Sequence, residues 1–273
     1  MSFRTAWRAA ARALIVFGSC GVLIPAADAA GFPNTCAPFG SIAKTHAIDG
    51  KCGLDGKVKS EGNRVQNRAK NNLCAQGQAG TMSFQAFADL QDAVDQAGIP
   101  FGSSNNLPET RDQLQQMGEG KLVRLAAYVL DAKYSNTSSG ESVNCKLKGA
   151  ANNDIHIALG SSADADACES VTAEMIPHFR PSQWTPAAVS AVGTHPVRIT
   201  GQLFFDGSHI PCRNGQAHSP ERVSVWEIHP VYAMEVCKNR RLSSCDADDD
   251  SVWTPLHQWG TQPIEDVTDD ADH

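Results

Sequence analysis

The spacing of apolar residues changes near residue 120, from a helical pattern before it to a strand-like pattern after it. Apolar residues recur at intervals of three and four over residues 84–97, which predicts a helix. Ser83 can cap its start, and Gly98 suits the left-handed conformation at its end. A shorter helix is predicted over residues 109–117, and it ends at Gly118 in the same way.

Beyond Lys121 the pattern predicts five strands, which cover residues 122–134, 154–159, 171–176, 197–205 and 223–236. Residues 185–193 lie between the third and fourth strands. They begin with a capping Thr followed by Pro and end with Gly, which predicts a short helix.

Three strands, a short helix and two further strands follow one another as in an OB-fold, so residues 121–237 resemble that fold in the order of their elements. The expected fold class is mainly β (α+β): an OB-fold-like five-stranded barrel with a helical, disulfide-rich N-terminal extension. A disulfide-bonded β-sandwich is the structural alternative. The expected domains are a signal peptide (1–29), an irregular, disulfide-held and helical extension (30–120), the barrel (121–245) and an acidic tail (246–273).

The first residues have the features of a secretory signal peptide: an Arg-containing start, an apolar stretch and the small-residue cleavage site Ala27-Asp28-Ala29. A lipoprotein signal ending at Cys20 is the weaker alternative. The apolar stretch is too short for a permanent membrane span. We therefore expect an exported protein, periplasmic or extracellular, with no transmembrane segment in the mature chain.

Removal of the signal peptide leaves an even number of cysteines, which in an exported chain favours disulfides. No two of them have the C-x-x-C spacing of zinc ribbons or redox sites. All eight are expected in disulfides, with the pairing open: Cys36, Cys52, Cys74, Cys145, Cys168, Cys212, Cys237 and Cys245.

Formal charge is unevenly distributed along the chain. Its net value of -7 comes mainly from residues 246–273, which contain acidic residues and no Lys or Arg. The balance before them argues against a strongly basic nucleic-acid surface, although residues 44–70 have a local basic excess that is compatible with nucleic-acid contact. A solvated tail is expected, with Trp253 and Trp259 indicating that part of it packs back on the domain.

The most suggestive polar pattern is an acid-x-His sequence on two predicted strands: Asp154 and His156 on one, Glu227 and His229 on the other. Side chains alternate across a strand, so each pair shares a face opposite its apolar neighbours and points away from the core. If the pairs converge, these four residues are candidate metal ligands or catalytic groups. The alternative is that they are ordinary polar positions on half-buried strands.

The stretches Asp154-Ile155-His156-Ile157-Ala158-Leu159 and Trp226-Glu227-Ile228-His229-Pro230-Val231 also resemble a group of exported bacterial proteins of unknown activity. That resemblance implies no particular chemistry. His178 and His209 follow the third and fourth predicted strands, so both could join a site at one end of the barrel.

Two functional hypotheses follow. The favoured one is an exported binding module for an oligosaccharide, a nucleic acid or an envelope protein, which uses outward strand positions Arg124, Tyr128, Arg198 and Phe204. The alternative is a metal-dependent hydrolase, such as a phosphodiesterase or nuclease, in which a divalent metal is the cofactor. OB-fold nucleases resembling the staphylococcal enzyme are a precedent, although their acidic and arginine pattern is not recognisable here.

Overall fold

The computed structural model describes residues 46–53, 55–102 and 108–260. The expected signal peptide, Cys20 and Cys36 lie outside these ranges. All the described residues belong to one compact unit. Within them, no helix has both the length and the apolar character needed to cross a bilayer.

Five strands close into a barrel in the order β2-β3-β4-β6-β5-β2. Their bounds are β2 (Leu122–Tyr134), β3 (Ile155–Gly160), β4 (Val171–Met175), β5 (Val197–Phe205) and β6 (Trp226–Cys237). β4 and β6 pair in parallel and the other four contacts are antiparallel, while helix α5 (Pro186–Ser190) connects β4 to β5. This is the OB-fold arrangement, and it confirms the expected barrel over the β-sandwich.

Alternation along the strands places one set of apolar side chains inside the barrel. This core includes Leu125, Ile157, Ala173, Ile199 and Ile228. Strand β2 reaches both sides of the closure because its first half pairs with β5 and its second half with β3, with a register shift between Val129 and Asp131. Such a bulge bends a strand, as barrel closure requires.

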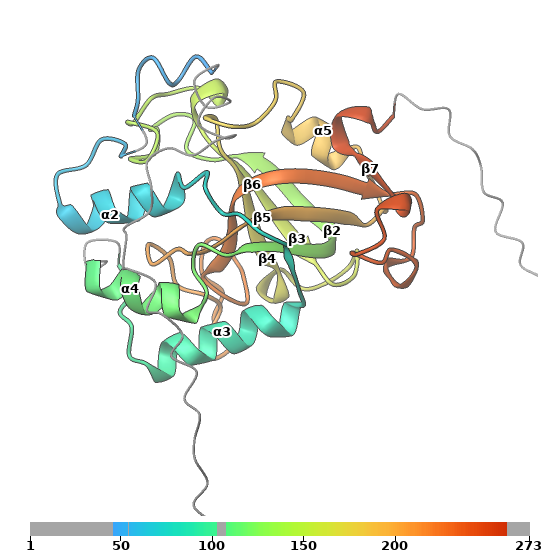
Figure 1. Ribbon diagram of the computed structural model, residues 1–273, viewed down its shortest axis with the longest axis horizontal. Coiled ribbons are helices and arrows are strands. Elements are labelled where there is room, and N and C mark those ends of the chain that lie inside the picture. Colours follow the sequence, from blue (N-terminus) through green and yellow to red (C-terminus); the bar gives the residue numbers. More distant parts are fainter. Residues whose placement is uncertain (1–45, 54, 103–107, 261–273) are drawn as a thin grey trace, which may run out of the picture. The chain divides into compact units, whose positions relative to one another are not determined.

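Two helices, predicted from their apolar spacing, lie outside the barrel and are confirmed. In α3 (Phe84–Gln96), Ser83 caps the first turn and Gly98 follows the helix with a φ of +65°. α4 (Pro108–Met117) ends before Gly118. Figure 1 shows both helices and α2 on one side of the barrel, away from α5 and β7.

Helix α2 (Glu61–Lys70) is not among the helices predicted from the sequence. Ser60 caps it by accepting a hydrogen bond from the Asn63 amide. The buried face of α2 carries Gln66 and Asn67 rather than an apolar stripe, so hydrophobic spacing does not reveal it.

Short elements complete the described chain. β1 (Gly80–Met82) pairs with β2 in parallel, and β7 (Trp253–Pro255) pairs with β6. Single-turn 3-10 helices occur at Ala150–Asn152, Ala167–Glu169, Leu242–Ser244, Asp250–Val252 and Leu256–Gln258.

Residues 246–260 pack on the barrel rather than forming a solvated tail. Trp253 is 5% exposed, and its indole nitrogen donates to the Asp246 carbonyl. Trp259 packs against the core. The expectation that the tryptophans pack back is confirmed, while residues 261–273 lie outside the described part.

Disulfides join Cys52 to Cys145, Cys168 to Cys212 and Cys237 to Cys245, and Cys74 is disulfide-bonded as well. The described cysteines therefore confirm the expected disulfides. The Cys52–Cys145 bridge ties the segment before α2 to the connection between β2 and β3, two segments that cover the same face of the barrel.

Loop length predicts how much each bridge contributes to stability. Cys52 and Cys145 are 93 residues apart, whereas Cys237 and Cys245 are 8 apart. The entropy of closing the longer loop in the unfolded chain is larger, so Cys52→Ala/Cys145→Ala should lower the free energy of unfolding by about 2 kcal/mol more than Cys237→Ala/Cys245→Ala. Urea denaturation of both variants measures this difference, and equal losses would contradict it.

Candidate functional site

Three neighbouring strands place polar side chains on the barrel face opposite the apolar core. His156 on β3 and Glu174 on β4 are directly paired across the two strands. Ala173 pairs with Ile228, so the side chains that follow it on β4 lie beside His229 of β6. Asp154 immediately precedes β3 on the same face. The two acid-x-His sequences thus point away from the core, as expected.

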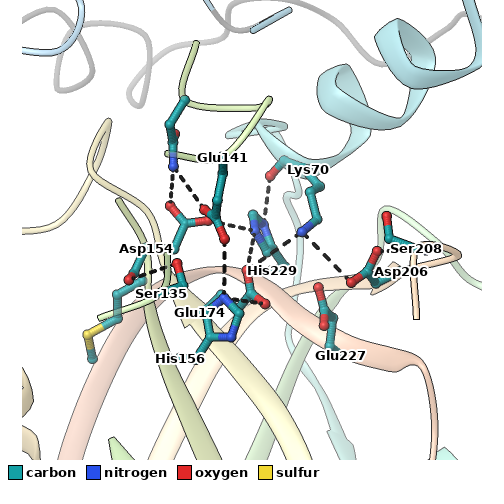
Figure 2. Close-up of polar contacts among 12 residues, drawn as sticks. Lys70, Ser135, Glu141, Asp154, His156, Glu174, Asp206, Ser208, Glu227 and His229 are labelled. Carbon is teal, nitrogen blue, oxygen red and sulfur yellow. Dashed lines mark hydrogen bonds and ion pairs between the residues drawn. The ribbon is translucent and has the colours of Figure 1, made fainter. Parts of the chain in front are cut away.

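This face is buried and not open to solvent, which corrects the expectation of an outward surface. Asp154, Glu227 and His229 are fully buried, and Glu174 is 1% exposed. The cover comes from α2 and from the connection between β2 and β3, which contributes Glu141 (Figure 2).

Five side chains, which we call the acid–histidine cluster, meet under this cover: Glu141, Asp154, His156, Glu174 and His229. His229 Nε2 lies 2.9 Å from Glu174 Oε2 and 3.6 Å from Asp154 Oδ2. His156 Nε2 lies 3.1 Å from Glu174 Oε1 and 3.7 Å from Glu141 Oε1. Figure 2 shows Glu174 between the two imidazoles.

Hydrogen bonds from neighbouring groups fix the orientations of the His229 and Asp154 side chains. His229 Nδ1 donates to the Lys70 carbonyl at the end of α2, at 2.9 Å, which leaves Nε2 directed at the carboxylates. The Asn144 amide donates to Asp154 Oδ1 at 2.9 Å. Asp154 Oδ2, Glu174 Oε2 and His229 Nε2 are buried and face one another at the ion-pair distances given above. One potential ligand atom from each of these three residues lies within 4.8 Å of the others.

The carboxylates of the cluster raise the pKa values of both imidazoles. Burial alone would lower the pKa of His229, but the charge of Glu174 and hydrogen bonds with Asp154 and Glu174 raise it to about 10. Burial also opposes the charged form of His156, while Glu174 and Glu141 raise its pKa to about 9. In the absence of a bound cation, protons on both imidazoles offset the negative charge of the carboxylates in the cluster.

The carboxylates divide into two kinds. Burial and the nearby charge of Glu141 raise the pKa of Asp154. Burial acts in the same direction on Glu174 and Glu141, but it is outweighed by neighbouring positive charges. His156, Lys70 and His229 hold the pKa of Glu174 well below its usual value, and a hydrogen bond with His156 lowers that of Glu141 to about 2.

A cavity of about 210 Å³ lies above the cluster. Glu141 and Lys70 line it and also contact cluster residues, since Lys70 Nζ lies 3.7 Å from Glu174 Oε2. His209, predicted as a loop candidate, lines it too and lies 3.5 Å from Asp206. Exposed Asn136 is part of the lining, so the cavity opens to solvent.

Glu227 belongs to a different set of contacts from the other three metal and catalytic candidates. Its Oε2 accepts from Arg222 at 2.6 Å, and Arg222 also lies 3.5 Å from Asp206. Burial and the negative charges of Glu174 and Asp206 raise the pKa of Glu227 to about 7. The convergence on which the metal and catalytic hypothesis depends therefore includes Asp154, His156 and His229, while Glu227 lies beside Arg222.

The four residues expected on an outward binding face have internal partners. Arg124 and Arg198 donate to Asp248 and Asp250, respectively, at 3.1 and 2.7 Å. Tyr128 donates to the Arg240 carbonyl. Phe204 is fully buried, which corrects its assignment as an exposed stacking residue. His178, the other loop candidate, contacts Asp49 rather than the cluster.

Sequence reasoning missed Glu174, Glu141 and Lys70. The sequence does contain a signal for Glu174, because it is the single charged residue of β4 and shares a face of the strand with Thr172. Glu141 and Lys70 come from the loop between β2 and β3 and from α2, whose placement requires the folded structure.

The pKa of His156 predicts how stability depends on pH in EDTA-treated protein. A histidine with a higher pKa when folded contributes stability that is complete below its ordinary pKa of 6.5 and is lost as pH rises to about 9. This change is on the order of 3 kcal/mol. In His156→Gln, the free energy of unfolding should therefore fall less over this interval than in the wild type. Urea denaturation at several pH values measures it, and parallel curves would contradict the assignment.

Comparisons with known proteins supply no further identification. No family model, no curated protein and no solved structure matches this chain. The functional argument accordingly rests on the barrel, the acid–histidine cluster and the cavity above it.

Proposed function

We propose that the protein is a divalent-metal-dependent hydrolase whose metal ligands are Asp154, Glu174 and His229. One observation carries this proposal: buried ligand atoms of these three residues lie within 4.8 Å of one another. Two buried carboxylate oxygens thus converge on one imidazole nitrogen, which has a single proton to donate, so a cation among them would satisfy both oxygens better.

The surrounding contacts support metal ligation. Metal-binding histidines commonly donate from their second ring nitrogen to a carbonyl, as His229 does to Lys70. Asn144 holds one oxygen of Asp154 and leaves the other directed at the cluster. These contacts orient both ligands before any ion arrives, which lowers the ordering cost of binding.

Charge supports a dication in particular. With neutral imidazoles, the three carboxylates of the cluster exceed the one nearby ammonium of Lys70 by two negative charges. A divalent cation would compensate this excess in place of the two imidazole protons. Two carboxylates and one imidazole suit zinc or manganese.

The ligand number and the cavity favour catalysis over a purely structural role. Three protein ligands leave a coordination position available, as in catalytic zinc sites. A divalent cation bound there would lower the pKa of a coordinated water and make it a nucleophile near neutral pH. His156 contacts Glu174 Oε1 and would act as a positioning residue.

We further infer that the protein functions outside the cytoplasm. Its described disulfides require an oxidising compartment to persist, in agreement with the signal peptide expected from the sequence. The non-catalytic binding module is less well supported, because Arg124, Arg198 and Tyr128 hold the C-terminal segment and Phe204 is buried.

The first test is metal binding by isothermal titration calorimetry. The wild type should bind one Mn²⁺ or Zn²⁺ and release protons, because the imidazoles must lose theirs. Glu174→Gln should weaken binding at least tenfold. Asp89→Asn is the matched control, since this exposed carboxylate lies on α3, which carries no residue of the cluster, and accepts a hydrogen bond from Gln85. No stoichiometric metal in the wild type, or equal affinity in folded Glu174→Gln, would reject the site.

Activity is then measured on a panel of p-nitrophenyl carboxylate esters, phosphomonoesters and phosphodiesters. The metal-loaded wild type should hydrolyse at least one class, and EDTA should abolish the reaction. Hydrolysis that persists in EDTA would contradict a metal-dependent mechanism.

A further inference from the structure

The lining of the cavity restricts what can enter it. Of its ten lining residues, Val143 alone is apolar, and no Phe, Tyr or Trp is among them. Amides and hydroxyls make up most of the remainder: Asn63, Gln66, Asn67, Asn136, Ser142 and Ser208. A hydrophobic or flat aromatic group would lose hydration here without gaining apolar contact, so the complementary ligand is polar.

Lys70 adds a positive charge with unused hydrogen-bonding capacity. Its ammonium lies 3.7 Å from Glu174 Oε2 and 3.9 Å from Asp206 Oδ2, at ion-pair distance but beyond hydrogen-bond distance. The side chain makes no hydrogen bond through Nζ among the described residues, although an ammonium has three N–H donors. Lys70 lines the cavity, so these donors are available to a ligand there.

Lys70 and the proposed metal share one neighbour. Glu174 Oε2 is near Lys70 Nζ, and the same carboxylate is a metal ligand in the proposed function. Two positive centres would therefore lie beside the Glu174 carboxylate, next to the lining residues Lys70 and Glu141. A ligand with several anionic oxygens can contact both, whereas a neutral ligand gains from neither.

Two exposed basic residues are neighbours of lining residues. Lys57 is exposed, and its backbone amide donates to the carbonyl of Ser142, a lining residue. Arg64 is exposed next to Asn63, another lining residue. Without metal, however, Glu141 and Asp206 make the floor acidic and would repel an anion. Anion binding in this cavity should therefore depend on the metal.

We propose that the cavity binds the phosphoryl group of a phosphate ester, with one phosphoryl oxygen on the metal and another accepting hydrogen bonds from Lys70 Nζ. This inference rests on the metal site of the proposed function and gives that site its substrate class. Phosphate is favoured over carboxylate because its greater charge and tetrahedral oxygens can contact both positive centres and the polar lining.

The test is calorimetric titration of inorganic phosphate and of acetate into Mn²⁺-loaded and metal-free wild type, Lys70→Met and Lys70→Arg. Mn²⁺ affinity is measured first for each protein. Lys238→Met is the control, because Lys238 is an exposed lysine just beyond the C-terminal end of β6 and donates to the Ser251 carbonyl. Circular dichroism and thermal unfolding establish that each variant is folded.

Phosphate should bind the Mn²⁺-loaded wild type at least tenfold more tightly than the metal-free protein, and more tightly than acetate. Lys70→Met should weaken phosphate binding at least tenfold while strengthening Mn²⁺ binding, because a repelling charge is removed from Glu174. A merely structural role for Lys70 would weaken both. Lys70→Arg should retain part of the phosphate affinity, and Lys238→Met all of it.

Several results would overturn the inference. Mn²⁺ binding without phosphate binding would reject the substrate class and leave the metal site standing. Equal affinities for acetate and phosphate, or unchanged phosphate affinity in folded Lys70→Met, would reject it as well. Absence of Mn²⁺ binding would reject the proposed function and this inference together. The wild-type comparison with and without Mn²⁺ keeps the test decisive even where Lys70→Met does not fold.

Discussion

Burial of like-charged carboxylates on the outer face of the barrel is the constraint on which the rest of the site depends. Asp154 and Glu174 lie beneath α2, where solvent cannot screen them, so positive charge has to come from the protein, from protons or from an ion. This requirement explains why Lys70 points inward and why both cluster imidazoles have raised pKa values.

The same constraint explains the composition of the cover. A helix over a charged face cannot present an apolar stripe, and α2 instead turns Gln66 and Asn67 toward the barrel. The Lys70 carbonyl at its end accepts a hydrogen bond from His229 Nδ1, while Gln202 on β5 donates to the Ala69 carbonyl at 2.9 Å. The end of α2 is therefore fixed by side chains of the barrel, and the Cys52–Cys145 bridge anchors the segment that precedes it.

The barrel could be predicted from the sequence because its strands alternate strongly, and α3 because its apolar residues recur at helical intervals. The same alternation places Asp154, His156 and His229 on one face.

Helix α2 could not be predicted this way, since the signal that reveals surface helices is hydrophobic spacing, which a helix covering a polar face lacks. Glu174 required knowledge of strand neighbours, because only the pairing of β3 with β4 brings it beside His156. Phe204 is buried rather than exposed as predicted, because α2 covers the face of the barrel on which it lies.

The parallel contact between β4 and β6 has a consequence for folding. The cluster combines residues from the β2–β3 connection, β3, β4 and β6, so it cannot form from local contacts and exists only once β6 has joined the barrel. A chain released before β6 is complete would lack both the strand that closes the barrel and His229. An ion that recognises this cluster would thus discriminate between the finished barrel and every less complete state, and its binding energy would stabilise the native state alone.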